Sequence, residues 1–344
     1  MDKSLGNFFY PNSVCIAGAS TKEGSLGYEV LKNIRQFNYK GKVLPVNPKT
    51  ELIHGFKCYS SIKQIDVEIN LAIVLVPKRF VVETIDELLA KGVKSIILIT
   101  AGFKETGADG EHLENTILEK IITANARLVG PNCMGVINST NTNLNATFIS
   151  EMSPMGRIAF QSQSGALGAA ILNSLRESDI KLAHFISVGN KADVNENDFL
   201  EYWQGDNNID ALTYYLESFN NGLEFIKPFL LNKAQKPVIV LKAGNTESGM
   251  RAASSHTGAL SSEDRVVNSL LKQAGVIRVD DVNELFNTAK GFEAYPIPRG
   301  NKVAVVTNAG GPSILLTDQL DKEELQLAEL SEATKIKLRT IVHP

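Results

Sequence analysis

Several features that assign proteins to broad classes are scarce or missing in this sequence of 344 residues. Its only cysteines, Cys15, Cys58 and Cys133, are widely spaced and form neither a CxxC pair nor a cluster with histidines, which argues against disulfides and zinc. No apolar run approaches the roughly 20 residues of a membrane helix, and the N-terminus lacks the basic start and apolar core of a signal peptide. We therefore expect a cytoplasmic protein without membrane contact and without a metal site of its own.

An excess of charge of either sign is also missing. The chain has 35 Lys and Arg against 38 Asp and Glu, so its net charge of -3 provides no broad basic field for nucleic acid. Apolar residues make up 43% of the chain, which is enough for a large core. At typical domain sizes, a chain of this length should divide into two or three domains.

Short β-rich apolar runs alternate with amphipathic, helix-like segments almost throughout, which predicts parallel βαβ units and an α/β fold. The first five runs are SVCIAG (13–18), KVLPVN (42–47), LAIVLVP (71–77), SIILIT (95–100) and ARLVG (126–130). They fit one Rossmann-like domain, predicted over residues 1–145. The polar, turn-rich segment 135–156 is interpreted as a linker.

A second series of runs predicts a second parallel α/β domain over residues 146–295. Its members are RIAFQS (157–162), HFISVGN (184–190), ALTYYLES (211–218), PVIVLKAG (237–244) and the weaker GVIRVD (275–280). A third series opens with KVAVVTN at residue 302. The residues that follow are too few for an ordinary α/β domain, so 296–344 is expected to be the start of an incomplete third domain.

Two segments of the chain are similar to each other. RIAFQSQSGALGAAILNSL (157–175) aligns without gaps with KVAVVTNAGGPSILLTDQL (302–320), and both predict strand, small-residue loop and helix. The unpaired N–H groups and the dipole at a helix N-terminus favour anions, so each copy is a candidate phosphate cradle. The alternative is that small residues merely let strand and helix pack, and for either copy alone the two interpretations have equal weight.

The first strand is followed by a glycine-rich loop, Gly18 to Gly27, whose spacing is not GxGxxG. Its glycines permit close backbone approach and its Ser and Thr hydroxyls can hydrogen-bond, which favours a phosphate-bearing ligand. The second strand ends at Lys49 rather than at the acidic residue that holds ribose in NAD-binding proteins. This lysine suits a phosphate-rich ligand such as CoA, although composition alone favours an ordinary solvated charge.

His256 lies in a long run of small residues, 242–260, that follows an apolar strand. A neutral imidazole in such a loop is a competent nucleophile near pH 7, particularly when a carboxylate holds its other nitrogen. Glu217 is the candidate carboxylate, because it ends a predicted strand at the edge where α/β sheets bind ligands. Both residues also fit structural roles, Glu217 as the start of a surface loop. The other four histidines occupy ordinary polar or boundary contexts.

These motifs together resemble, in order and spacing and over essentially the whole chain, the α subunit of ADP-forming acetyl-CoA synthetase and, more distantly, succinyl-CoA synthetase. The segments that carry the resemblance are GASTKEGSLG (18–27), VLPVNPK (43–49), AIVLVP (72–77), ITAGFKETG (99–107), LVGPNCMGVIN (128–138), QSQSGALG (161–168), YYLES (214–218), SSHTGAL (254–260) and VTNAGGPS (306–313). The resemblance implies a Rossmann-like CoA-binding domain, then flavodoxin-like ligase domains, with the nucleotide on a separate ATP-grasp module.

The resemblance also implies roles for individual residues. CoA contacts fall on Ser20, Thr21, Ser25, Leu26 and Lys49, with Val76 and Pro77 beside the adenine and Asn132 near the thiol. His256 would carry the phosphoryl group, Glu217 would stabilise it, and the phosphate helices would open at Ser164 with Gly165 and at Gly310 with Gly311.

The implied reaction converts acyl-CoA, phosphate and ADP into a small carboxylic acid, CoA and ATP, through an acyl phosphate and a phosphohistidine. An ATP-grasp subunit or domain would supply the site for ATP/ADP and Mg²⁺, and an oligomer is expected. Two alternatives stay open. One is a non-catalytic CoA sensor within a larger fused protein. The other is an NAD-dependent oxidoreductase, which rests on the Rossmann-like start alone.

Overall fold

The structure is a computed structural model that describes residues 3–246, 248–249 and 264–341. The chain divides into two units, Met1–Ala294 and Tyr295–Pro344, which are treated separately. The first unit holds two large β-sheets, and none of the described helices is long and apolar enough to cross a membrane.

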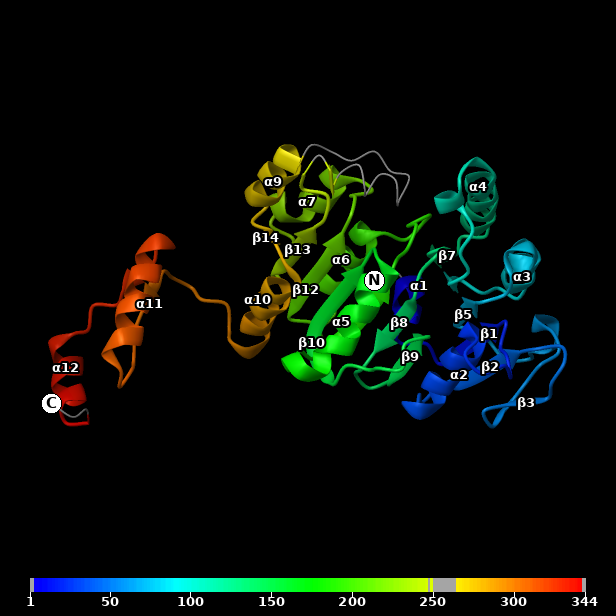
Figure 1. Cartoon of the computed structure of the whole chain (residues 1–344), viewed down its shortest axis with the longest axis horizontal. Coiled ribbons are helices and arrows are strands. Elements are labelled where there is room, and N and C mark those ends of the chain that lie inside the picture. Colours follow the sequence, from blue (N-terminus) through cyan, green and yellow to red (C-terminus); the bar gives the residue numbers. More distant parts are fainter. Residues whose placement is uncertain (1–2, 247, 250–263, 342–344) are drawn as a thin grey trace. The chain divides into compact units, whose positions relative to one another are not determined.

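The first sheet has five parallel strands in the order β2-β1-β5-β6-β7. They belong to the part of the chain that is coloured blue to teal in Figure 1. Its strands are β1 (Ser13–Ala17), β2 (Lys42–Val46), β5 (Leu71–Val74), β6 (Ser95–Leu98) and β7 (Arg127–Val129). Around them lie α1 (Lys3–Phe9), α2 (Leu26–Gln36), α3 (Val81–Ala90), α4 (Ala108–Thr123), the hairpin β3 (Leu52–Ile53) and β4 (Phe56–Lys57), and the 3₁₀ turns η1 (Ile62–Gln64), η2 (Lys78–Phe80) and η3 (Lys104–Thr106). All residues of β1, β5 and β6 are buried, because both faces of a parallel sheet are covered. The predicted five-strand α/β arrangement is confirmed.

The second sheet has seven strands in the order β14-β13-β12-β10-β11-β8-β9. Its parallel strands are β10 (Met155–Ser162), β11 (Leu182–Ser187), β12 (Ala211–Leu216), β13 (Val238–Lys242) and β14 (Ile277–Val279). Its helices are α5 (Gly165–Ser178), α6 (Glu196–Gln204), α7 (Gly222–Leu230), α9 (Asp264–Gln273) and α10 (Val282–Ala294). Buried side chains of α5 and α10 share one core with one face of the sheet, whereas α6, α7 and α9 share another core with the opposite face.

The segment predicted to be a linker is part of this second sheet, so that prediction was wrong. β8 (Gly135–Asn138) and β9 (Leu144–Thr147) form an antiparallel hairpin, and β8 pairs with β11. Several of the polar side chains that suggested a linker, Asn138, Thr140, Asn145 and Thr147, are buried, and they form hydrogen bonds with one another in two local pairs. Asn138 Oδ1 accepts hydrogen bonds from the Thr140 N–H and hydroxyl at 2.8 and 2.6 Å. The predicted boundary near residue 145 falls inside β9.

The second unit is small. It contains β15 (Lys302–Val303), α11 (Gly310–Lys322), β16 (Gln326–Leu327) and α12 (Glu332–Arg339), and its two short strands pair in parallel. It begins with the expected strand, loop and helix, although the strand is shorter than the apolar run. Most of its described side chains are exposed, with Leu320 as a buried exception.

Candidate active site

A pocket of about 620 Å³ opens where β10, β11 and β12 end. Segments that follow these three strands line much of the pocket, and residues before β8 and along α4, together with Lys104, Phe148 and Ala169, complete the lining. The loop segments in the lining are 163–166, 189–192, 217–220 and 132–134, with Glu111, Glu114, Asn115 and Leu118 from α4. The carboxyl ends of parallel strands are the usual ligand edge of α/β sheets, so this pocket is the natural candidate for a reacting site.

The N-terminus of α5 lies at this pocket. Ser164 is the N-cap residue, and its hydroxyl accepts a hydrogen bond from the Leu167 N–H at 3.3 Å. Gly165 and Ala166 follow it in the first turn and line the pocket. The first-turn N–H groups have no partner inside the helix, and the helix dipole adds positive potential there. An anion in this part of the pocket is therefore favoured.

Glu217 comes directly after β12, is only 8% exposed and also lines the pocket. The loop that carries it is fixed by Gln163, whose side-chain oxygen accepts hydrogen bonds from the N–H groups of Glu217 at 2.9 Å and Ser218 at 3.1 Å. The Gln163 amide nitrogen donates to the Ser218 hydroxyl at 3.2 Å. The loop after β10 thus holds the loop after β12.

Asn132 reaches the pocket from a constrained turn. Its φ of 56° lies in the left-handed region, and the peptide bond before Pro131 is cis. Its side-chain amide contacts Asn190 at 3.4 Å. Gly189 packs against this turn so closely that a Cβ would stand 2.3 Å from the Pro131 and Asn132 carbonyl oxygens. Only glycine fits there, and Asn132 is brought to the same pocket as Ser164, Gly165 and Glu217.

Asn190 also joins two carboxylates on the α4 side of the pocket, donating to Glu105 at 2.7 Å and to Glu114 at 2.9 Å. Burial raises the pKa of Glu114 despite the hydrogen bond from Asn190. Burial would also raise the pKa of Glu105, but hydrogen bonds from Asn190 and from the Gly102 and Phe103 N–H groups hold it below its usual value. These residues were not predicted individually, because their proximity depends on contacts 76 and 85 positions apart.

The glycine-rich loop lies at the carboxyl edge of the first sheet. Gly18 has a φ of 102°, and a Cβ there would stand 2.8 Å from the Leu75 carbonyl carbon. A Cβ on Gly27 would stand 2.1 Å from the Gly18 oxygen, so α2 begins directly on the loop. Ser25 is the N-cap of α2, and its hydroxyl donates a hydrogen bond to the Lys22 carbonyl oxygen. The Lys22 N–H in turn donates to the Ser20 hydroxyl.

The remaining residues predicted to contact CoA follow the ends of β1, β2 and β5, which are neighbours in the sheet. Thr21, Leu26, Lys49 and Pro77 are exposed and Val76 is half-buried. The Asn47 amide anchors the second of these loops, because it donates to the Ala19 carbonyl at 2.7 Å and its oxygen accepts from the Lys49 N–H. None of these residues lines the 620 Å³ pocket.

Comparisons with known proteins match two different family models to two regions of the chain. The model of a CoA binding domain matches residues 12–139, and that of a succinyl-CoA ligase like flavodoxin domain matches residues 155–292. The chain is 44% identical over 340 residues to subunit alpha of ADP-forming acetate–CoA ligase II from Pyrococcus furiosus, covering 99% of this chain and 74% of that protein.

The chain belongs to the ADP-forming acetate–CoA ligase family. It is 40% identical to the ADP-forming acetate–CoA ligase of Methanocaldococcus jannaschii and spans 48% of that protein's length. A solved structure of a dinucleotide forming acetyl-coenzyme A synthetase 1 from Ca. Korarchaeum cryptofilum, in complex with phosphate and ADP, superimposes with a TM-score of 0.92 at 34% identity. That match covers 99% of this chain and 73% of the solved chain.

Not every predicted site residue of this acetate–CoA ligase homologue is placed in the pocket. His256 lies outside the described residues, which end at 249 and resume at 264 on either side of it. Gly310 and Gly311 begin α11 in the second unit and are exposed. Among the described residues, no group of three or more His, Cys, Asp and Glu side chains is arranged to hold a metal ion.

One other histidine differs from its sequence interpretation. His184 was assigned to an ordinary polar or boundary context, but it is fully buried in β11, and that interpretation was wrong. Its ring stacks on Phe9 at 4.1 Å, accepts a hydrogen bond from the Trp203 indole at 3.1 Å and contacts the Tyr10 hydroxyl at 3.0 Å. Burial lowers the pKa of His184 to about 3, so the ring is neutral and structural.

Proposed function

We propose that this chain is the CoA-binding and phosphohistidine-bearing part of a nucleoside-diphosphate-forming acyl-CoA synthetase. It would interconvert acyl-CoA, phosphate and ADP with a carboxylic acid, CoA and ATP. The observation that carries the proposal is the pocket, which gathers the α5 N-terminus, Asn132 and Glu217 from separate parts of the chain. Its support from outside the chain is the family membership.

The proposed chemistry has two steps on this chain. A phosphate oxygen attacks the thioester carbonyl, the C–S bond breaks and CoA leaves as the thiolate, which gives an acyl phosphate. An imidazole nitrogen of His256 then attacks phosphorus, and the carboxylic acid leaves as the carboxylate. The α5 N-terminus would stabilise the phosphoryl charge, and the carboxylate of Glu217 would hold the other imidazole nitrogen.

The CoA site is proposed at the carboxyl edge of the first sheet. The approach of Gly18 and Gly27 leaves no room for a side chain, while a Cβ at Gly24 would meet nothing within 4 Å, so the loop is tight at its ends and open in its middle. The hydroxyls of Ser20, Thr21 and Ser25 and the Lys49 ammonium would hold phosphates there. Leu26 would contact the phosphate and ribose part of CoA, and Val76 and Pro77 would lie beside the adenine.

A partner module is proposed for the nucleotide. The described residues include no acidic metal cluster, so the Mg²⁺ that accompanies ADP and ATP would be bound by an ATP-grasp subunit or domain. The P. furiosus relative is called a subunit alpha, and the M. jannaschii relative is about twice as long as the matched region. Gly310 and Gly311 would cradle the phosphoryl group from a second helix N-terminus.

The test is phosphoryl transfer from γ-labelled ATP to the full protein with its ATP-grasp partner. His256→Ala should abolish an acid-labile, base-stable label. His112→Ala is the matched control, because His112 is an exposed histidine of α4, and it should label like the unmodified protein. Label retained in His256→Ala would refute the proposed phosphohistidine. CoA binding without any label would instead favour a CoA sensor.

A further inference from the structure

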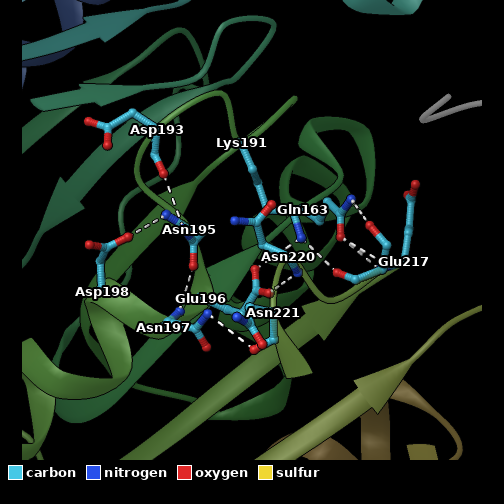
Figure 2. Close-up of polar contacts among 11 residues, drawn as sticks. Gln163, Lys191, Asp193, Asn195, Glu196, Asn197, Asp198, Glu217, Asn220 and Asn221 are labelled. Atoms are coloured by element: carbon cyan, nitrogen blue, oxygen red, sulfur yellow. Dashed lines mark hydrogen bonds and ion pairs between the residues drawn. The ribbon is translucent and has the colours of Figure 1, made fainter. Parts of the chain in front are cut away.

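A buried ion pair lies beneath the loop that carries Glu217. Lys191 Nζ and Glu196 Oε2 are 2.9 Å apart, and their side chains are only 4% and 0% exposed. Lys191 Nζ also donates to the Ser218 carbonyl at 2.6 Å, and the other Glu196 oxygen accepts from the Asn220 N–H (Figure 2). One ion pair therefore binds the backbone on both sides of residue 219.

The two charged residues come from rigid positions. Lys191 has a φ of 55°, in the left-handed region that a residue with a side chain adopts only at an energetic cost. Gly189, two residues before it, is pressed against the turn that carries Asn132. Glu196 is the first residue of α6, whose capping box at Asn195 fixes the helix start and whose dipole favours a negative charge there.

We infer that Lys191 and Glu196 are positioning residues for Glu217, and that they hold its loop in the geometry needed for phosphoryl transfer to the histidine. Gln163 fixes the same loop at Glu217 and Ser218 from the β10 side. The ion pair fixes it at Ser218 and Asn220 from the α6 side. Glu217 thus stands on a backbone segment that is held at three residues, Glu217, Ser218 and Asn220. This inference rests on the proposed function.

Stability alone is a poor explanation for this pair. Removing two charges from water is expensive, and apolar residues of similar volume often stabilise a protein at least as well. Here both charged groups use their hydrogen-bonding capacity on the backbone of the pocket loop rather than only on each other. Because a displacement of about 1 Å in a catalytic group can reduce a rate roughly 100-fold, holding this loop has a direct catalytic value.

The experiment measures the single-turnover rate of His256 phosphorylation by γ-labelled ATP in the full protein with its ATP-grasp partner. Lys191→Met should reduce this rate by about 10- to 100-fold while the CoA dissociation constant stays within about twofold. Glu196→Gln is the milder variant, because its amide oxygen still accepts from the Asn220 N–H. Glu196→Gln should fold and phosphorylate His256 about tenfold more slowly, so it keeps the test available if Lys191→Met does not fold.

Two controls separate positioning from general damage. Asp210→Asn breaks the Arg157–Asp210 ion pair, which lies where β10 and β12 begin, whereas the pocket lies where these strands end. This variant should leave the phosphorylation rate within about twofold of that of the unmodified protein. The second control repeats Glu196→Gln in a Glu217→Gln background. If Glu196 acts through Glu217, it should have little further effect there, because the effects of residues acting as one unit do not add.

The outcomes are distinct. Coupled, non-additive rate losses with unchanged CoA binding support the positioning role. Multiplicative losses in the double variant, or rates equal to that of the unmodified protein, overturn it and leave the proposed function in place. Absence of label in the unmodified protein overturns the proposed function and this inference with it.

Discussion

The side-chain oxygen of Gln163 accepts a hydrogen bond from the backbone N–H of Glu217 at 2.9 Å. Gln163 immediately precedes Ser164, the N-cap of α5, so this contact joins the proposed phosphate cradle to the proposed orienting carboxylate. The geometry of the two groups is therefore coupled through one amide side chain.

Gln163→Leu is expected to destabilise the protein by about 1–3 kcal/mol, because it leaves buried backbone N–H groups without their acceptor. It should also slow His256 phosphorylation. Gln163→Glu is the control, since it keeps an acceptor for the Glu217 N–H and should lose less stability. Denaturant unfolding and labelling measure the two effects, and equal stabilities of the two variants would contradict the account.

Ser164→Ala should cost about 1 kcal/mol of stability, because the side-chain cap on the Leu167 N–H is lost. Ser164→Asp separates capping from phosphate binding. Aspartate caps a helix well, so stability should be retained, but its negative charge at the α5 N-terminus should repel phosphate and reduce phosphohistidine formation. Undiminished labelling of Ser164→Asp would contradict the proposal that phosphate binds at the N-terminus of α5.

Gly27→Ala should abolish CoA binding and destabilise the first sheet, because the new methyl group would lie 2.1 Å from the Gly18 oxygen. Gly291→Ala is the matched control. Gly291 lies inside α10, where a Cβ meets nothing within 4 Å, so alanine should stabilise the protein by about 1 kcal/mol. Calorimetric titration with CoA and thermal unfolding provide the measurements. Normal CoA affinity in Gly27→Ala would place the ligand elsewhere.

The buried His184 predicts a specific pH dependence of stability. Burial lowers the pKa of its ring from 6.5 to about 3, although Asp206 opposes this shift. Between those pH values the unfolded chain binds the proton and the folded chain does not. The contribution of the neutral His184 ring to the free energy of unfolding is therefore fully present above pH 6.5 and is lost as the pH falls towards 3. Over this range the free energy of unfolding should fall by about 1.4 kcal/mol per pH unit.

The variant that isolates this effect is His184→Gln, whose amide can still accept from Trp203 and donate to Tyr10. The unfolding free energy of the unmodified protein, minus that of the variant, should decline as the pH falls from 6.5. A difference that is constant with pH would show that His184 does not titrate as its burial requires.

The sequence predicted the strands of the first sheet well because β1, β5 and β6 are buried on both faces and read as unbroken apolar runs. It failed for the hairpin of β8 and β9, whose buried Asn and Thr side chains satisfy one another locally and have the composition of a turn-rich linker. Composition records polarity but not whether a polar group has found a partner inside the fold.

The candidate site was predicted in part. Ser164, Gly165, Asn132 and Glu217 were expected from their motifs, and the structure brings them to one pocket. The groups that hold these residues were missed. Gln163 contacts a loop 54 residues away, a pairing that no local pattern signals. The roles of the CoA contacts and of His256 stay predictions.

The central claim is that this chain's own pocket makes an acyl phosphate and passes its phosphoryl group to His256. The most direct test omits nucleotide: the full protein is mixed with labelled inorganic phosphate and acetyl-CoA, propionyl-CoA or succinyl-CoA. The account predicts acid-labile label on His256 that requires both phosphate and one of the acyl-CoA substrates and is reduced in Glu217→Gln. Label that forms only from ATP, and never from phosphate with any of these acyl-CoA substrates, would contradict it.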